Sequence, residues 1–438
     1  MSSAPGAPAP PLPADASAAP APPPGGIPFA ALQNRDYRIY FLGSMLSMMG
    51  DNIEHVLSYW VVFQQFQSPA LGGFAVISHW LPSLLFSVHS GALADRYDCR
   101  KLIQAAQLLF LGVSLAWGVL IYTDSLEVWH ALVLLMLHGF AVVLWGPSSQ
   151  IILHDMVGRR HLQSAIRLSA TGRQLGLLLG PGVGGAMLLL FGPGIGLLCN
   201  ALLYLPLTLW LLTVPYTGHI KESADSARRR GLGLREAFGV FKAVSHDRPL
   251  VAMISLTGLT SVLVGNSFSA QMPAFAHDLG TDQAGMAYSA LLGANAAGAV
   301  LGGLMLESFG LLQARARTAI VCAAIWCLTI VGFAATNSYP LALVLLFVAG
   351  VLNLAYSAMA QTLAQLLAPP DQRGRVVGLF NMAQSGLKVG SGFTVGVLGG
   401  MIGIHWSLGI SAVALLLLVG RIWQFLGRDA SERTRLPA

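Results

Sequence analysis

Long apolar runs alternate with short polar connections along most of this chain. Each run holds about 20 or more mostly apolar residues, the number that an α-helix needs to cross the ~30 Å hydrocarbon layer of a bilayer. No stretch alternates apolar and polar residues as a strand of a membrane β-barrel does. The pattern predicts an all-α membrane protein with twelve transmembrane helices, at roughly 38–64, 70–92, 101–122, 127–152, 163–190, 194–214, 249–272, 284–306, 316–335, 339–366, 375–398 and 404–426.

Basic residues occur in alternate connections between these segments. Lys and Arg concentrate in cytoplasmic loops, so this alternation predicts that both termini face the cytoplasm. One missed or spurious helix would scramble the alternation. The basic connections contain Arg35, Arg38, Arg96, Arg100, Lys101, Arg159, Arg160, Arg315, Arg317, Arg373, Arg375, Arg428, Arg433 and Arg435, in addition to the central loop.

The longest internal polar stretch divides the predicted helices into six and six. It covers about 215–248 and includes three consecutive arginines. Similar basic turns precede the fifth and the eleventh segment, and two similar six-helix halves are typical of a transporter that rocks one half against the other. The basic linker is either a solvated connection or a contact for anionic lipid. We expect a disordered tail (1–28), an N-terminal bundle (29–214), a cytoplasmic linker (215–248), a C-terminal bundle (249–426) and a C-terminal tail (427–438).

Composition agrees with a membrane protein and excludes several other classes. The chain is 55% hydrophobic and only 10% charged, whereas soluble proteins carry about 25% charged residues. The net charge of +6 is dispersed along the chain, which argues against a nucleic-acid partner. The first basic residue is Arg35, so no signal peptide is expected. The four cysteines form no CxxC pair, and no catalytic motif such as HExxH is present. We expect no enzyme activity, no cofactor and a monomer.

Five charged residues fall well inside the predicted spans, away from their ends, where a charge costs about 2.5–3.5 kcal/mol on insertion scales and is a functional candidate. In the first span Asp51, Glu54 and His55 are spaced i, i+3 and i+4, which places them on one helix face. Two carboxylates this close repel each other, which favours a proton carrier or a site for a cationic substrate group. The other three charges are Arg167, Arg173 and Lys388.

The deep cations and the membrane histidines each have two interpretations. Arg173 and Lys388 either neutralise Asp51 and Glu54 as buried pairs or bind an anionic substrate directly. Arg167 lies nearer a helix end and is expected to reach the interface. The histidines inside the predicted spans are His79, His89 and His138. They either carry protons or a metal ion, or they are hydrogen-bonded core residues.

The loop between the second and third spans, Gly91-Ala92-Leu93-Ala94-Asp95-Arg96-Tyr97-Asp98-Cys99-Arg100-Lys101, resembles the G-x-L-a-D-r-x-G-r-r/k signature of the major facilitator superfamily. Asp98 stands where the usual glycine is, as in members that resemble siderophore and macrolide exporters. The resemblance implies a cytoplasmic latch in which Asp95 faces the start of the eleventh helix, after Arg373-Gly374-Arg375. In the alternative, Asp95 only pairs with Arg96 or Arg100. The expected latch residues are Gly91, Asp95, Arg96 and Arg100.

The fifth span carries Gly176-Leu177-Leu178-Leu179-Gly180-Pro181-Gly182-Val183-Gly184-Gly185, which is similar to the antiporter signature G-x3-G-P-x2-G-G of exporters in this superfamily. The resemblance implies a bend at Pro181 where the halves meet, although small residues also serve close helix packing alone. The fourth span departs from the family, since His138-Gly139 stands near the place of an arginine tied to proton coupling. The expected bend motif comprises Gly176, Gly180, Pro181, Gly184 and Gly185.

These resemblances imply a multi-pass protein of the bacterial inner membrane that exports a small organic molecule by alternating access. The expected substrate is siderophore-like or drug-like, and protons are the expected coupling ion in an antiport. Asp51-x3-His55 also resembles the first-helix metal ligands of ferroportin-like members. The alternative function is therefore export of a divalent metal ion bound by Asp51 and His55.

Overall fold

The computed structural model describes residues 29–218, 234–265, 267–280, 284–309, 315–369 and 373–433. Every regular element among them is helical, as the apolar pattern predicts. The expected tail 1–28 and residues 219–233 of the expected linker lie outside these ranges. The elements are η1 (Ala30–Gln33), α1 (Arg35–Phe66), α2 (Pro69–Arg96), α3 (Cys99–Tyr122), α4 (Val128–Ala201), η2 (Leu202–Tyr204), α5 (Leu205–Thr213), α6 (Leu234–Ala243), α7 (Arg248–Leu263), α8 (Ser267–Ala270), α9 (Met272–Asp278), α10 (Ala284–Phe309), α11 (Ala316–Ala335), α12 (Tyr339–Leu367), α13 (Arg373–Ser385), η3 (Gly386–Lys388), α14 (Val389–Ser391), η4 (Gly392–Val397), α15 (Leu398–Ile402) and α16 (Ile404–Arg433).

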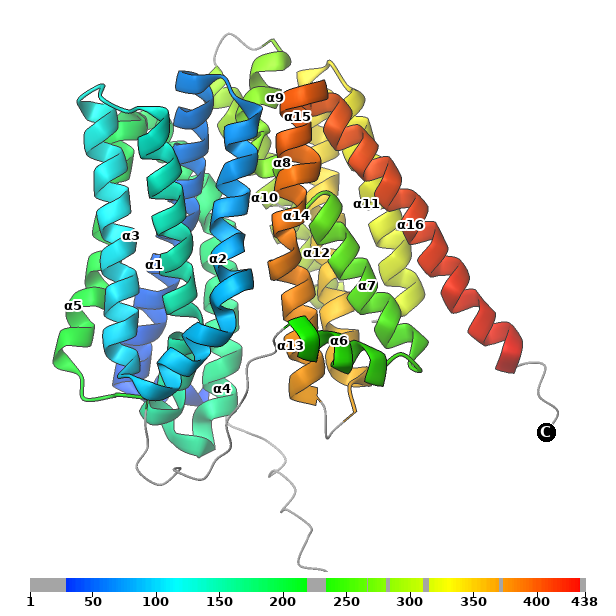
Figure 1. Cartoon of the computed structure of the whole chain (residues 1–438), viewed down its shortest axis with the longest axis horizontal. Helices are drawn as coiled ribbons and strands as arrows, with labels where there is room; N and C mark the ends of the chain where they lie inside the picture. The colour runs from blue at the N-terminus through cyan, green and yellow to red at the C-terminus, as the bar shows by residue number, and fades with distance from the viewer. Residues whose placement is uncertain are drawn as a thin grey trace, which may run out of the picture.

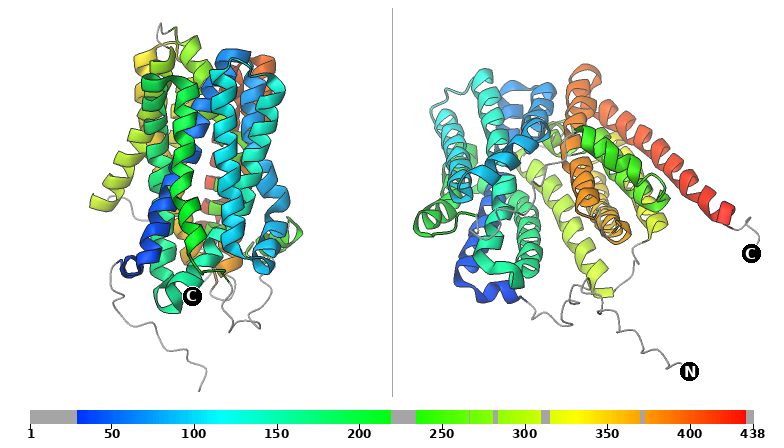
Figure 2. Two further views of the ribbon diagram at one scale, coloured as in Figure 1. Left: turned by 90° about the vertical axis from the view of Figure 1, so that its left-hand side faces the viewer. Right: turned by 60° about the horizontal axis from the view of Figure 1, so that its bottom comes forward.

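The helices form two groups that lie side by side. Helices α1 to α5 make up one group and α7 to α16 the other, and the short helix α6 lies at the lower end of the second group (Figure 1). The right-hand view of Figure 2 also shows the two groups apart. The start of α1 and the end of α16 both lie at the lower end of the molecule (Figures 1 and 2).

Eight helical segments in the described part of the chain are long and apolar enough to cross a membrane. Helix α1 is not among them, and its apolar sequence is interrupted by the polar run Asp51-Asn52 and by Glu54-His55. The C-terminal segment 373–402 is divided among short helical elements. The multi-span, all-helical architecture is thus confirmed in its coarse form. The eight segments are Pro69–Phe86, Cys99–Tyr122, Val128–Gly158, Arg160–Thr213, Arg248–Ala270, Ala316–Ala335, Tyr339–Leu367 and Ile404–Gly427.

Helix α4 changes direction twice, at glycines in the left-handed region of backbone conformation. Gly158 has φ 66° and Gly192 has φ 73°, whereas the rest of the element keeps helical torsions. Glycine adopts a positive φ without the steric penalty of a Cβ atom. The three parts of α4, before, between and after these residues, correspond to the expected fourth, fifth and sixth segments.

The glycine-rich part of α4 packs against α1 along a row of close contacts. A Cβ atom built on Gly176 would lie 2.8 Å from Cβ of Met48, and one on Gly180 would lie 2.4 Å from Cβ of Asn52. One turn further, a Cβ on Gly184 would meet Val56 at 3.0 Å. Glycines spaced by four residues therefore let the two backbones approach closely. The torsions stay helical at Pro181, and the bend expected there remains a prediction.

The two groups of helices contact each other near the upper end of Figure 1, where α2, α9 and α15 come together. A Cβ on Gly396 would lie 2.1 Å from Cα of Gly73, so the backbones of η4 and α2 touch. The side-chain amide of Gln271 donates to the Pro69 carbonyl at 2.7 Å, and the Tyr288 hydroxyl donates to the Val56 carbonyl at 2.9 Å. These contacts join residues more than 200 positions apart in sequence.

The glycine row predicts opposite effects for two neighbouring substitutions. We expect Gly180→Ala to lower the free energy of unfolding by about 1–3 kcal/mol, because its Cβ overlaps Asn52. Gly182→Ala, two residues along the same helix, meets nothing within 4 Å and should be neutral or stabilise by up to about 1 kcal/mol. Thermal unfolding of the purified protein in detergent measures both. Equal melting temperatures for the two variants would contradict the packing described for Gly180.

Candidate functional site

Helix α1 presents a polar group at about the middle of its length. Asp51, Glu54 and His55 lie on one face of the helix, as their spacing predicts. Glu54 is buried, with 2% of its surface exposed, while Asp51 and His55 are half-buried. The ring of His55 lies 3.8 Å from the Asp51 carboxylate, measured from Nδ1 to Oδ2. The structure therefore brings together the three α1 residues that the sequence singles out.

The imidazole of His138, on the first part of α4, lies between the two carboxylates. Its Nδ1 is 2.7 Å from Oε1 of Glu54, and its Nε2 is 2.8 Å from Oδ1 of Asp51. His138 is 4% exposed and packs edge-on against the ring of Phe110, with the two ring centroids 5.0 Å apart. His138 is buried and hydrogen-bonded, as a core histidine is, but its partners are the charged residues of the site.

Two protons must be shared among these three groups. Each hydrogen bond between a ring nitrogen and a carboxyl oxygen needs one proton between the two atoms. Either the imidazole carries both protons, or it carries one and a carboxyl group carries the other. In both arrangements the group Asp51–His138–Glu54 has a net charge of −1. The second oxygen of Glu54, Oε2, is buried and has no hydrogen-bond partner in the described part of the chain.

A third histidine, His79 on α2, extends the site. Its Nδ1 lies 3.1 Å from Nε2 of His55, and it is 7% exposed. The ring centroids of His55 and His138 are 5.0 Å apart, and those of His79 and His138 are 5.3 Å apart. One potential ligand atom from each of Asp51, His55, His79 and His138 lies within 4.8 Å of the others. In the described residues this is the one such group of three or more His, Cys, Asp or Glu residues.

A close contact between α2 and α4 places the two added histidines. A Cβ on Gly139 would lie 2.0 Å from the carbonyl oxygen of Ser78, so the two backbones touch at this point. Gly139 follows His138 and Ser78 precedes His79, and both histidines are thereby brought to the polar face of α1. The sequence signal for this arrangement is the pair His138-Gly139 within the fourth apolar segment.

Lys388 reaches the edge of the site from the other group of helices. It ends η3, is half-buried, and its ammonium nitrogen lies 4.4 Å from the centroid of the Trp80 ring. The Trp80 ring is in edge contact with His79 at 4.7 Å. The charge of Lys388 acts electrostatically on His55 and His79. Lys388 therefore lies beside the histidines rather than in a direct ion pair with Asp51 or Glu54.

Arg173 is not part of this group. Its side chain is exposed, and its charge acts on Tyr40. Of the two interpretations of Arg173, burial as a partner of the carboxylates does not agree with its exposed side chain, since depth along a helix does not determine which way a side chain points. Within the described residues, the ion-pair partners of Asp51 and Glu54 are histidines. The side chain of Arg167 lies outside the described residues.

The loop expected to form the latch is described in part. The side chains of Asp95, Arg373 and Arg375 lie outside the described residues, so the latch contact remains a prediction. Arg100 pairs with Asp98 at 3.2 Å and donates a hydrogen bond to the carbonyl of Val214. Of the other two expected residues, Gly91 is half-buried with no atom within 4 Å of its Cβ position, and Arg96 is exposed over the ring of Tyr97.

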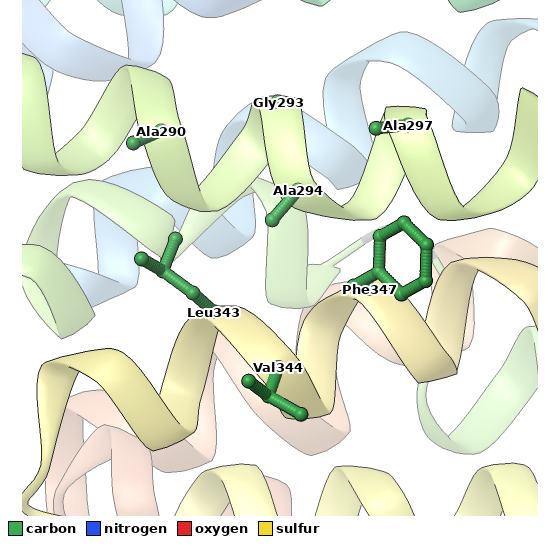
Figure 3. A pocket seen from close by; sticks show the side chains of 7 residues that line it. All are labelled: Ala290, Gly293, Ala294, Ala297, Leu343, Val344 and Phe347. Atoms are coloured by element: carbon green, nitrogen blue, oxygen red, sulfur yellow. The ribbon is translucent and has the colours of Figure 1, made fainter.

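Two apolar grooves lie away from the polar site. One, of about 520 Å³, runs between α10 and α12 and is lined by small and aliphatic residues, among them Ala294 and Phe347 (Figure 3). The other contains His89, which is exposed beside Phe86. His89 therefore belongs neither to the buried core nor to the group around His138.

Comparison with known proteins gives the family. The sequence profile of the transmembrane secretion effector family matches residues 26–432. The chain is 23% identical to the staphyloferrin A transporter of Staphylococcus aureus over 54% of its own length, and the match spans 58% of that relative. It is 22% identical to macrolide efflux protein A of Streptococcus pyogenes, over 77% of this chain and 82% of that protein.

A solved structure shares the fold. It is that of a bacterial homologue of the human lysosomal transporter Spinster, in an inward-facing and unoccupied conformation. The TM-score is 0.66 at 17% identity, and the superposition covers 94% of this chain and all of that chain. The fold and the family are those of transporters rather than enzymes. The chain belongs to the transmembrane secretion effector family of the major facilitator superfamily.

Proposed function

We propose that this protein exports a small organic molecule across the bacterial inner membrane in exchange for protons. The observation that carries this proposal is the buried bridge of His138 between Asp51 and Glu54. Ionisable residues inside a membrane protein mark substrate or proton pathways, because their burial is otherwise too costly. The family supports transport, and the two named relatives are transporters of organic compounds.

The bridge gives a physical link between protonation and helix position. Its two hydrogen bonds join α4 to α1 and together hold two protons. Loss of one proton leaves a ring nitrogen and a carboxylate oxygen facing each other as two acceptors, which repel. The contact between α1 and α4 must then open at that point. Uptake of a proton restores the contact.

Alternating access is supported by the contacts between the helix groups. The described hydrogen bonds between them, such as those of Gln271 and Tyr288, join the upper parts of the helices. If both termini are cytoplasmic, as the basic residues predict, this closed end faces the outside. A state closed on that side would be one that a substrate enters from the cytoplasm before export.

The finer architecture belongs to the same proposal. Twelve transmembrane helices in two bundles, 29–214 and 249–426, would be joined by a cytoplasmic linker, with both termini in the cytoplasm and the transporter a monomer. The latch at Asp95 and a flexible bend at Pro181 would control closure of the cytoplasmic end. Lys388, near the centre of the protein, and the exposed Arg173 would bind acidic groups of a siderophore-like substrate.

A second candidate function is export of a divalent metal ion. The observation that favours it is that Asp51 and His55 are joined by His79 and His138 in one group of potential ligands. A metal ion would then be the cargo, and Co²⁺ is a suitable probe.

The bridge predicts that His138→Gln uncouples transport from protons. Wild-type protein in proteoliposomes is supplied with staphyloferrin A, a labelled macrolide or Co²⁺, with and without a pH gradient. We expect gradient-driven accumulation of an organic probe by the wild type, and a fall to the level of protein-free liposomes in His138→Gln. Exchange of labelled for unlabelled probe without a gradient should persist, because exchange needs no net proton movement.

His89→Gln is the matched control, because His89 is exposed and is not part of the group around His138. It should accumulate the probe as the wild type does. Gradient-driven accumulation at the wild-type rate in His138→Gln would refute the coupling role. Movement of Co²⁺ together with no movement of either organic probe would replace the first function by the second.

A further inference from the structure

We propose that Asp51, His55, His79 and His138 form a binding site for one first-row divalent metal ion, such as Zn²⁺ or Co²⁺. The four residues come from α1, α2 and α4, and the potential ligand atoms lie within 4.8 Å of one another. The site overlaps the one on which the proposed function rests, but binding does not require that the metal be the cargo. The two proposals therefore fail separately, one in a binding assay and the other in a transport assay.

The ligand atoms that these four side chains offer determine which class of metal ion the site would bind. Three imidazoles and one carboxylate suit Zn²⁺ and its neighbours in the first transition row, whereas Mg²⁺ and Ca²⁺ prefer oxygen ligands alone. The spacing is also near that of a four-coordinate site. Ligand bonds of about 2.0–2.2 Å place neighbouring ligand atoms roughly 3.4 Å apart in a tetrahedron.

Two of the separations are close to that spacing, namely 2.8 Å between His138 Nε2 and Asp51 Oδ1 and 3.1 Å between His55 Nε2 and His79 Nδ1. With one ligand atom from each residue, the four atoms lie within 4.8 Å of one another. The four atoms need to move inward by about 1 Å at most to share one ion. The ion takes the position of the proton that joins His138 to Asp51.

Glu54 completes the site as a positioning residue. Its Oε1 lies 2.7 Å from Nδ1 of His138, while Nε2 of the same ring faces Asp51. With a metal ion bound at Nε2, the neutral ring carries its proton on Nδ1 and donates it to Glu54. Metal-binding histidines commonly donate their second ring N–H to a carboxylate in this way, and the carboxylate fixes the orientation of the ring. Glu54 is 2% exposed and is not itself within the group of ligand atoms.

The charges within the site balance when the ion is present. A divalent cation together with the Asp51 and Glu54 carboxylates sums to zero if the three imidazoles are neutral. A neutral cluster avoids the penalty that an unpaired charge carries inside a protein. Without the ion, the same residues reach neutrality only by binding additional protons.

Among the described residues, Lys388 is a charge that approaches the site from the other helix group. Its ammonium lies against Trp80, which contacts His79, and its charge acts on His55 and His79. A positive charge at this place opposes a bound cation. Metal affinity should therefore depend on how closely η3 approaches α2.

The proposal predicts saturable binding of one ion per protein. The full-length protein, purified through a tag without histidine, is titrated with Zn²⁺ or Co²⁺ in a calorimeter. His79→Gln and His55→Gln should each weaken binding by at least about tenfold, since each removes a ligand. The visible absorption of Co²⁺ should be that of a four-coordinate site.

His89→Gln, on the same helix as His79, is the matched control and should leave the affinity unchanged. Size-exclusion profiles and melting temperatures identify any variant that fails to fold. If a variant fails to fold, the coordination number read from the Co²⁺ spectrum of the wild type tests the site in its place. No saturable heat in the wild type, a six-coordinate Co²⁺ spectrum, or equal affinities in His79→Gln and His89→Gln would overturn the site.

The positioning role of Glu54 has its own signature. Glu54→Leu, which removes the acceptor for His138, should lower the affinity about 10–100-fold. Glu54→Gln keeps an acceptor oxygen at the same place and should recover part of that loss. Equal affinities in Glu54→Leu and the wild type would show that the ring needs no such support.

Removal of the opposing charge should act in the other direction. Lys388→Met keeps a side chain of similar length against Trp80 and removes the ammonium group. We expect the affinity for Zn²⁺ to rise in this variant, and the rise to be larger at low than at high salt. An unchanged affinity at both salt concentrations would contradict electrostatic opposition by Lys388.

Discussion

The buried imidazole of His138, hydrogen-bonded to a carboxylate on each side, is the constraint around which the N-terminal helices are arranged. Asp51 and Glu54 lie on α1 and His138 on α4, so the pairing fixes the distance and rotation between the two helices. Breaking a buried charge pair by removing one partner typically costs about 3–5 kcal/mol. The two helices must therefore stay in contact as long as the bridge holds both of its protons.

Close approach of backbones makes this pairing possible. Gly139 lets α4 touch α2 beside His79, and Gly180 lets the next part of α4 touch α1 beside Asp51. A lipid environment offers no hydrophobic force to press helices together, so packing of small residues and polar contacts must do so. The glycines and the ionisable residues consequently act together. The glycines allow the short distance between helices that the hydrogen bonds need, and the hydrogen bonds hold the helices at that distance.

The sequence predicted the features that depend on one helix and missed those that depend on two. The spacing of Asp51 and Glu54 is a property of α1, and their common face followed directly from helical periodicity. The partnership with His138 depends on the rotation of α4 against α1, which no local pattern encodes. Arg173 illustrates the same limit, because its depth along the helix was a good reason to suspect burial, yet its side chain is exposed. The reversals at Gly158 and Gly192, in contrast, left a clear signal in the breaks between apolar segments.

The arrangement also explains how a site within one half of the protein can respond to the other half. All four potential ligands and Glu54 belong to α1, α2 and α4, whereas Lys388 belongs to η3 in the opposing group. Movement of η3 relative to α2 changes the distance of its ammonium group from His79, and with it the electrostatic potential at the site. Binding of protons or of a metal ion at the site is then coupled to the relative position of the halves. If the position of the halves changes the affinity of the site, binding at the site must by linkage change the equilibrium between the positions.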